Sequence, residues 1–358
     1  MSIKKIELTN FTVFEDLNIE FCDGINIFIG ENATGKTHIM KLIYSACKAT
    51  NPKDYFSQKI VNTFKPEDYK ISRLISRKEG ISKSKVKITA IKNKIEQNIG
   101  IEFNTKTSKW DADVYEEQQW ETTFDDLESI FIPAKEILSN SYNIISANEK
   151  NNVEFDDTYI DILHSAKVDI SETQENIFEN ILSKLEKIMD GKVIFDSKKD
   201  KFYIEEKSTK LEFNLVAEGI RKIALIWQLI KNGVLKKGSV LFWDEPEANI
   251  NPIHIPFIVD MLLEFQRNGV QIFISTHDYT LSKYFDINSK DKNSVKFFSL
   301  YKTDDGVKCE GSNKFKNLEI NTIRDTFIQL YQDEINMEQQ TVNKNIYKSI
   351  QIYSSLHS

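Results

Sequence analysis

The sequence is poor in the residues that build cross-linked, secreted or membrane-spanning proteins. It has three cysteines, Cys22, Cys47 and Cys309, which are scattered through 358 residues without metal-ligand spacing. A disulfide framework is therefore not expected, and a reducing cytoplasm is the simplest location. The N-terminus lacks the apolar run of a signal peptide, and the densest apolar run, residues 223–230, is too short to span a bilayer. We expect a cytoplasmic protein with no membrane partner.

An excess of basic charge is also missing, which excludes a generally basic nucleic-acid coat. Lysine and arginine number 47 against 54 acidic residues, a net charge of −7, so any nucleic-acid contact must come from a local patch. Residues 73–94 hold eight basic residues and one acid, whereas residues 110–128 hold eight acids and no base. The basic stretch, including Lys83, Lys85 and Lys87, either contacts phosphate backbones or forms a solvated surface that the acidic stretch balances. We favour the second interpretation.

Hydrophobic patterning predicts an α/β fold with a largely parallel sheet. Short apolar segments at 25–29, 130–133, 239–243 and 270–274 are typical of buried strands, and segments at 36–49, 220–231 and 255–267 have helical spacing. Alternating segments between 3 and 21 and between 84 and 104 predict further strands. We divide the chain into an N-terminal part (1–136), a helical insertion (137–190), a C-terminal part of the same core (191–300), and an extension (301–358). The extension would hold a strand, a helix near 321–331 and a polar tail prone to fraying.

Glycine is scarce, with 12 residues, yet two of them flank the loop between the strand at 25–29 and the helix that follows. This loop matches G-x-x-x-x-G-K-[ST] in full, through Gly30, Glu31, Asn32, Ala33, Thr34, Gly35, Lys36 and Thr37. The glycines let successive backbone N–H groups face phosphates at the positive end of the helix. Lys36 would reach the outer phosphates, and Thr37 would offer its hydroxyl to Mg²⁺. The motif predicts a site for a nucleoside triphosphate such as ATP.

A second motif places acids at the end of a buried strand, in the run Val240-Leu-Phe-Trp-Asp244-Glu245. Ligands bind at the carboxyl ends of strands in such sheets. Asp244 would therefore hold Mg²⁺, and Glu245 would act as the general base for the water that attacks the γ-phosphate. His277 follows the strand at 270–274, and it could contact the γ-phosphate.

Together these residues resemble the heads of ABC-type ATPases, in the branch that includes the RecF, SMC and OLD-like proteins. Walker A corresponds to residues 30–37, Walker B to 240–245, the D-loop to 247–252, and the switch histidine to His277. The segment at 131–136 resembles the neighbourhood of the Q-loop but has no clear glutamine. The resemblance implies a P-loop NTPase with a mixed sheet core, N-terminal antiparallel strands and a helical insertion. It is greatest to stand-alone bacterial ATPases that lack a Toprim domain and often belong to anti-phage systems.

The signature segment departs from this family. The run Leu215-Val-Ala-Glu-Gly-Ile-Arg-Lys222 keeps Gly219, but Ala217 stands where the family has a serine. The resemblance implies that Gly219 faces ATP across a dimer. Arg221 or Lys222 would either supply charge there or lie on a solvated helix face.

The resemblance implies an ATPase that dimerises, or forms a higher oligomer, around ATP and controls a separate effector, a nuclease or toxin in anti-phage defence. Two alternatives stay open. One is a DNA-repair or chromosome-maintenance ATPase that DNA stimulates, and the other is an ATP-sensing scaffold that does not hydrolyse ATP, which the Ala217 departure favours.

Overall fold

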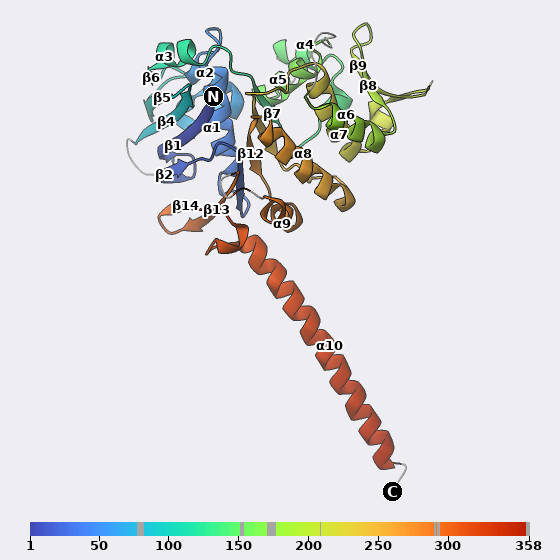
Figure 1. Ribbon diagram of the computed structural model, residues 1–358. Coiled ribbons are helices and arrows are strands. Elements are labelled where there is room, and N and C mark those ends of the chain that lie inside the picture. The colour runs from blue at the N-terminus through green and yellow to red at the C-terminus, as the bar shows by residue number, and fades with distance from the viewer. Residues whose placement is uncertain are drawn as a thin grey trace.

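A computed structural model describes residues 1–76, 82–150, 154–169, 177–207, 209–289, 291 and 294–355 (Figure 1). Its strands are β1 (Ser2–Phe11), β2 (Phe14–Glu20), β3 (Ile25–Gly30), β4 (Lys83–Lys92), β5 (Ile95–Asn104), β6 (Asp113–Tyr115), β7 (Ser129–Ile132), β8 (Lys192–Asp196), β9 (Lys201–Glu206), β10 (Thr209–Glu212), β11 (Val240–Asp244), β12 (Gln271–Ser275), β13 (Val295–Thr303) and β14 (Gly306–Ser312). Its α-helices are α1 (Lys36–Lys48), α2 (Phe56–Phe64), α3 (Glu117–Thr123), α4 (Ile144–Glu149), α5 (Asp157–Ala166), α6 (Glu179–Met189), α7 (Glu218–Lys231), α8 (Ile255–Arg267), α9 (Tyr279–Asn288) and α10 (Thr322–Ser355).

The central sheet has the strand order β14-β13-β3-β12-β11-β7. The strands from β13 to β7 run parallel, and β14 alone is antiparallel. The predicted mixed sheet is therefore confirmed. Its topology brings the ends of β3, β11 and β12, which are far apart in sequence, to one edge where ligands can meet them.

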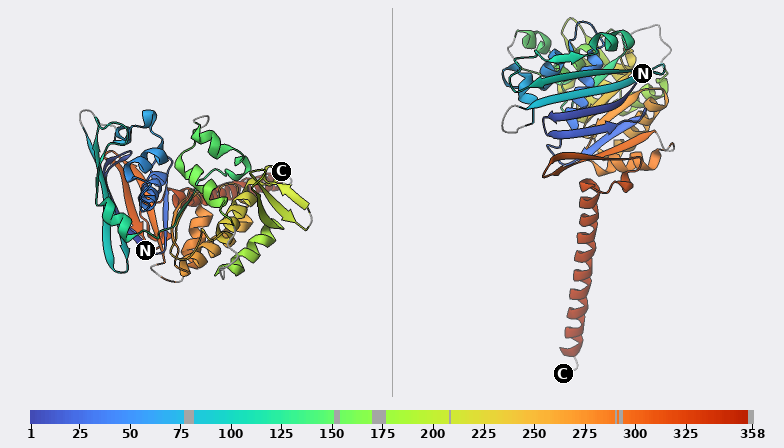
Figure 2. Two further views of the ribbon diagram at one scale, coloured as in Figure 1. Left: turned by 90° about the horizontal axis from the view of Figure 1, so that it is seen from above. Right: turned by 90° about the vertical axis from the view of Figure 1, so that its left-hand side faces the viewer.

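The N-terminal strands form a second, antiparallel sheet in the order β2-β1-β4-β5-β6, as the alternating patterns predict. This sheet forms an outer wall of the molecule, and α1 lies between it and the central sheet (Figure 2). Buried Gln271 joins the two sheets, because its side chain bonds both the N–H and the carbonyl of Ile3. A small third sheet has the order β10-β9-β8.

Each of the five parallel strands contributes to two cores, as a strand buried on both faces must. In β3, the residues Ile25, Ile27 and Ile29 join the core formed with α5 to α9, whereas Phe28 joins the core formed with α1 and the antiparallel sheet.

A ladder of phenylalanine rings crosses the central sheet on the α1 side. The rings of Phe131, Phe242, Phe273, Phe28 and Phe298 follow one another on neighbouring strands at centroid distances of 6.0, 5.1, 6.5 and 5.4 Å. Such offset contacts contribute beyond simple burial. These stacked rings pack beneath α1 and hold the strands that carry the site in fixed positions relative to one another.

The C-terminal helix differs from the prediction. Rather than ending near residue 331 in a fraying tail, α10 runs without a break from Thr322 to Ser355 and projects away from the rest of the molecule (Figure 1). Its first turns are anchored by Ile323, which is buried, and by Phe327, which stacks on Tyr279 at 4.3 Å. The projecting part was not predicted because its low apolar content gives no clear helical period. Among the described residues, no helix is both long and apolar enough to cross a membrane.

Candidate functional site

The loop between β3 and α1 has the shape that its glycines predict. Gly30 and Gly35 both adopt positive φ, at 137° and 86°. A Cβ on Gly30 would stand 2.1 Å from the carbonyl oxygen of Leu300, and one on Gly35 would stand 2.4 Å from the ring of Phe14. Larger residues therefore cannot take this path. Ala33 is also left-handed, at φ 62°, and its exposed neighbours Glu31 and Asn32 form the rim of the loop.

Inside the loop, side chains bond the backbone and fix its curvature. The buried Thr34 hydroxyl donates to the carbonyl of Glu31 at 2.8 Å. Nζ of Lys36 donates to the carbonyls of Gly30 at 2.9 Å and Glu31 at 2.8 Å. Burial lowers the pKa of Lys36 to about 8, although Asp244 and Glu245 oppose the shift. The ammonium thus lies within a cradle of backbone groups, where a phosphate would restore its full charge.

The first turn of α1 meets the end of β11 through Thr37 and Asp244. The Thr37 hydroxyl lies 3.1 Å from Oδ2 and 3.3 Å from Oδ1 of Asp244. The hydroxyl of Ser275, at the end of β12, also donates to Oδ1 of Asp244. Burial raises the pKa of Asp244, and its two hydroxyl partners oppose that shift. These hard oxygen donors suit Mg²⁺.

Magnesium would need further ligands here. No group of three or more His, Cys, Asp or Glu side chains in the described part of the chain could hold a metal. A magnesium ion that shares its shell with nucleotide phosphates and water needs only one or two protein ligands. The pair Thr37 and Asp244 therefore fits an ion that also binds nucleotide phosphates and water.

Glu245 and His277 face each other across the ends of β11 and β12. Their Oε1 and Nε2 atoms are 3.9 Å apart. Glu245 has the left-handed φ of 48°, and its N–H donates to the carbonyl of Ser275 at 3.0 Å. Burial and the charge of Lys36 lower the pKa of His277 despite the nearby carboxylate. A neutral imidazole therefore stands beside a carboxylate held in a strained backbone, an arrangement common at catalytic sites.

Most of the predicted phosphate-loop residues, together with Glu245 and His277, line one cavity of about 300 Å³, whereas Gly30, Glu31, Thr34 and Asp244 are not among its lining residues. It is lined by Val13, Asn32, Ala33, Gly35, Lys36, Thr37, His38, Glu245, Ser275 and His277. The sequence prediction missed Val13 and His38, as well as Ser275. The position of Ser275 at the end of a predicted strand was an available signal for it.

The signature segment does not line this cavity, since none of residues 213–222 is among the lining residues. Instead, Gly219 packs against the D-loop, where a Cβ would stand 2.5 Å from the carbonyl oxygen of Asn249. Lys222 is 2% exposed and donates to the carbonyls of Ala248 at 2.9 Å and Glu245 at 3.3 Å. The expectation that Lys222 lies on a solvated face is wrong, because its side chain is buried and bonds backbone carbonyls. A contribution of its charge to a nucleotide stays a prediction.

Arg221 is paired within the chain. Its Nε lies 2.9 Å from Oε2 of buried Glu136, in the segment likened to the Q-loop, and its Nη1 donates to the carbonyl of Phe213 at 3.1 Å. A contact between Arg221 and a nucleotide stays a prediction.

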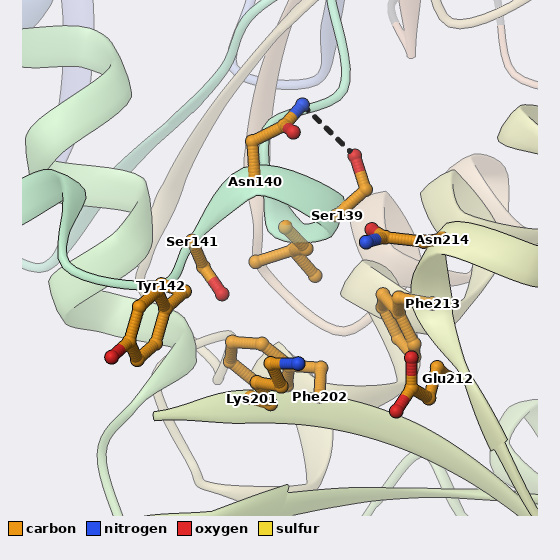
Figure 3. A pocket seen from close by; sticks show the side chains of 10 residues that line it. Ser139, Asn140, Ser141, Tyr142, Lys201, Phe202, Glu212, Phe213 and Asn214 are labelled. Carbon is orange, nitrogen blue, oxygen red and sulfur yellow. Dashed lines mark hydrogen bonds between the residues drawn. The ribbon is translucent and has the colours of Figure 1, made fainter. Parts of the chain in front are cut away.

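Beside Phe213 lies a second cavity of about 310 Å³, in which Lys201 and Glu212 are the charged lining residues (Figure 3). This second cavity contains none of the phosphate-loop residues.

The basic stretch is largely balanced where the structure describes it; residues 77–81 lie outside the described residues. Lys83 and Lys85 both pair with Glu102, and they hold its pKa down to about 2. Lys92 pairs with Asp126 at 2.6 Å, which joins the basic stretch to the acidic one. These contacts agree with the interpretation of a charge-balanced surface.

Comparisons with known proteins agree with this geometry. The family model described as "AAA domain, putative AbiEii toxin, Type IV TA system" matches residues 25–283. The DNA replication and repair protein RecF of Streptococcus gordonii is 31% identical over 90 residues, 25% of each chain. The RecF protein of Clostridium kluyveri is 38% identical over 69 residues, 19% of each chain. The chain thus spans no more than about a quarter of the length of these two relatives.

Among solved structures, the chain is similar to an SMC head bound to the C-winged helix domain of ScpA. The TM-score is 0.57 at 15% identity, and the match covers 87% of this chain and 97% of that one. At this identity the likeness concerns the fold alone. It confirms the expected P-loop NTPase fold and, with the family and the RecF relatives, an ABC-type ATPase head of the RecF and SMC branch.

Proposed function

Because the chain belongs to the family described as "AAA domain, putative AbiEii toxin, Type IV TA system", we propose that it is a magnesium-dependent ATPase whose copies close around ATP. One observation carries this proposal. Thr37, Glu245 and His277 line the cavity beside the phosphate-binding loop, and Asp244 contacts Thr37 next to it. Phosphate cradle, metal ligands and candidate base are therefore present in a single site.

ATP would place its phosphates in the loop, against backbone N–H groups and the positive end of α1. Lys36 would exchange its carbonyl partners for phosphate oxygens. Thr37 and Asp244 would hold Mg²⁺, which supplies charge stabilisation to the β- and γ-phosphates.

Hydrolysis requires a water oriented for attack on the γ-phosphate. Glu245 is the acceptor for a proton of that water. His277, whose pKa is lowered, can donate the single N–H of its neutral imidazole to the γ-phosphate. The residues proposed as catalytic are Lys36, Glu245 and His277.

Two copies are proposed because one chain does not bring its own signature segment to the cavity. Gly219 of a second copy would close the site, so that each ATP is held between chains. Leu215 and Ile253 support this arrangement: they are 71% and 75% exposed, and each lies within four residues of the contact between Gly219 and the D-loop. Exposed apolar side chains beside such a contact are typical of an interface.

We propose that the cycle controls a separate effector, a nuclease or toxin, in anti-phage defence. The description of the family includes a putative toxin, which supports this role. So does the lack of a metal-binding acidic cluster in the described part of the chain, since a metal-dependent nuclease would need one. This step rests on family analogy.

A DNA-stimulated repair or chromosome-maintenance ATPase is the second candidate, and the RecF relatives favour it. The pairing of Lys83 and Lys85 with Glu102 argues against the basic stretch as its DNA site. An ATP-sensing scaffold that does not hydrolyse ATP is the third candidate.

Steady-state ATP hydrolysis with and without duplex DNA separates the three, with Glu245→Gln as the blank. Turnover above the blank that DNA leaves unchanged supports the first candidate. Stimulation by DNA, lost on neutralising Lys83, Lys85 and Lys87, supports the second. Tight ATP binding without turnover supports the third.

A further inference from the structure

Glu247 is a half-buried acid that the motifs leave without a role. It lies two residues beyond Glu245, and its Oε1 accepts hydrogen bonds from the Thr276 hydroxyl at 2.6 Å and from the N–H of His277 at 3.3 Å. Its Oε2 is buried and has no hydrogen-bond partner in the described part of the chain. Burial raises the pKa of Glu247 to about 7. Such a costly group in a folded protein needs an explanation.

The contacts of Glu247 reach the backbone that carries His277. The Thr276 N–H donates to the carbonyl of Phe28 at 3.0 Å, and the Thr276 hydroxyl accepts from the N–H of Asp278 at 2.9 Å. The single hydroxyl proton of Thr276 is therefore used on Glu247. Asp278 in turn caps α9 by accepting from the N–H of Leu281. Residues 276–278 therefore bond to β3 and to the start of α9. Among these contacts, those of Glu247 connect the segment to the D-loop.

On the other side, Glu247 stands between two carbonyls that are held in place. Lys222 bonds the carbonyls of Glu245 and Ala248, which flank Glu247 in the sequence. The backbone beneath Glu247 is consequently fixed from α7. The Glu247 carboxylate, held by this backbone, accepts a hydrogen bond from the N–H of His277 and so restricts where His277 can lie.

We infer that Glu247 is a positioning residue that holds His277 in register with Glu245, so that both face the γ-phosphate. The inference rests on the proposed function. Glu247 touches neither phosphate nor metal in this account, since it is absent from the lining of the cavity. Its loss should therefore reduce the rate of the chemical step and leave ATP binding largely intact.

The conservative variant separates this role from simple burial of a charge. In Glu247→Gln, the amide oxygen can accept the same two hydrogen bonds, whereas Glu247→Ala leaves the Thr276 hydroxyl and the His277 N–H without their acceptor. We expect Glu247→Ala to lower kcat at least about tenfold with KM for ATP within about twofold. Glu247→Gln should keep kcat within about threefold of the wild type.

Thr276→Val provides a second route to the same contact. It removes the hydroxyl donor without altering the carboxylate, and it should also lower kcat. Because it removes the acceptor of the Asp278 N–H as well, its loss should be less than additive when it is combined with Glu247→Ala. Glu186→Ala is the matched control. It removes another hydrogen-bonded acid, which accepts from Nε1 of Trp227 at 3.0 Å on the far helix α6, and it should leave kcat unchanged.

The experiment is steady-state ATP hydrolysis by the full-length chain, with thermal unfolding of each variant recorded alongside. A kcat for Glu247→Ala equal to that of the wild type overturns the inference, and so does a Glu247→Gln variant that falls as far as Glu247→Ala. If the wild type hydrolyses no faster than Glu245→Gln, the proposed function fails instead, and the two failures are told apart by that comparison.

Discussion

The hydroxyl of Thr37 lies 3.1 Å from Oδ2 of Asp244, which joins the first turn of α1 to the end of β11. This contact brings together two motifs that are separated by about two hundred residues. It also places two oxygen donors of the kind that Mg²⁺ prefers beside the phosphate-binding loop.

Removing the charge of Asp244 should weaken magnesium binding at the site and leave the protein folded. Metal stabilisation of a phosphoryl-transfer transition state is worth several kcal/mol, so Asp244→Asn should lower kcat by about a hundredfold or more. Hydrolysis measured against magnesium concentration checks this. Asp125→Asn, which alters an exposed acid paired with Lys92, is the control. An unchanged magnesium requirement in Asp244→Asn would show that the metal binds elsewhere.

Gly35 offers a test of the loop itself, with Gly238 as its match. Both have positive φ, 86° and 88°, but a Cβ on Gly35 would meet Phe14 at 2.4 Å whereas one on Gly238 would meet nothing within 4 Å. Gly238→Ala should cost about 1–2 kcal/mol of unfolding free energy from backbone strain alone. Gly35→Ala should cost more and also weaken ATP binding at least about tenfold. Denaturant unfolding and nucleotide titration measure the two effects. Equal losses in both variants would refute the close packing at Gly35.

The raised pKa of Glu247 predicts a pH dependence of stability. The carboxyl binds its proton up to about pH 7 in the folded chain, but only up to its lower ordinary pKa when unfolded. Stability therefore falls as pH rises through this window and is lowest above it. The negative charge of Asp278 adds to the shift, and the hydrogen bonds from Thr276 and His277 oppose it. The side chain in Glu247→Gln does not titrate. The Tm of this variant minus the Tm of the wild type should therefore rise between pH 6 and pH 8. A Tm difference that is flat over this range would contradict the raised pKa.

Leu215 and Ile253 test the contact between copies. Changing either to aspartate should weaken ATP-dependent association at least about tenfold, because a buried charge replaces apolar contact. ATP binding by the single chain should persist. Ile287→Asp is the control, since Ile287 is similarly exposed but lies on α9. Sedimentation of each variant with ATP and magnesium gives the measurement, and association equal to the wild type would place the interface elsewhere.

Much of the fold and the phosphate site could be predicted because their signals are local. The glycines of residues 30–37 and the acids after β11 sit in short contiguous motifs at strand ends. The roles of Lys222 and Glu247 could not be predicted, since each depends on how loops from different strands pack. Similarly, the pairing of Arg221 with Glu136 joins segments 85 residues apart, and no sequence pattern marks it.

The mass of Glu245→Gln in solution, with and without ATP and magnesium, tests whether two copies close around the nucleotide. Without nucleotide, light scattering should give the mass of one chain, 41.6 kDa. Because this variant should bind ATP without hydrolysing it, adding ATP and magnesium should raise the mass to about twice that value. A mass that stays at one chain while ATP is demonstrably bound would contradict the shared site.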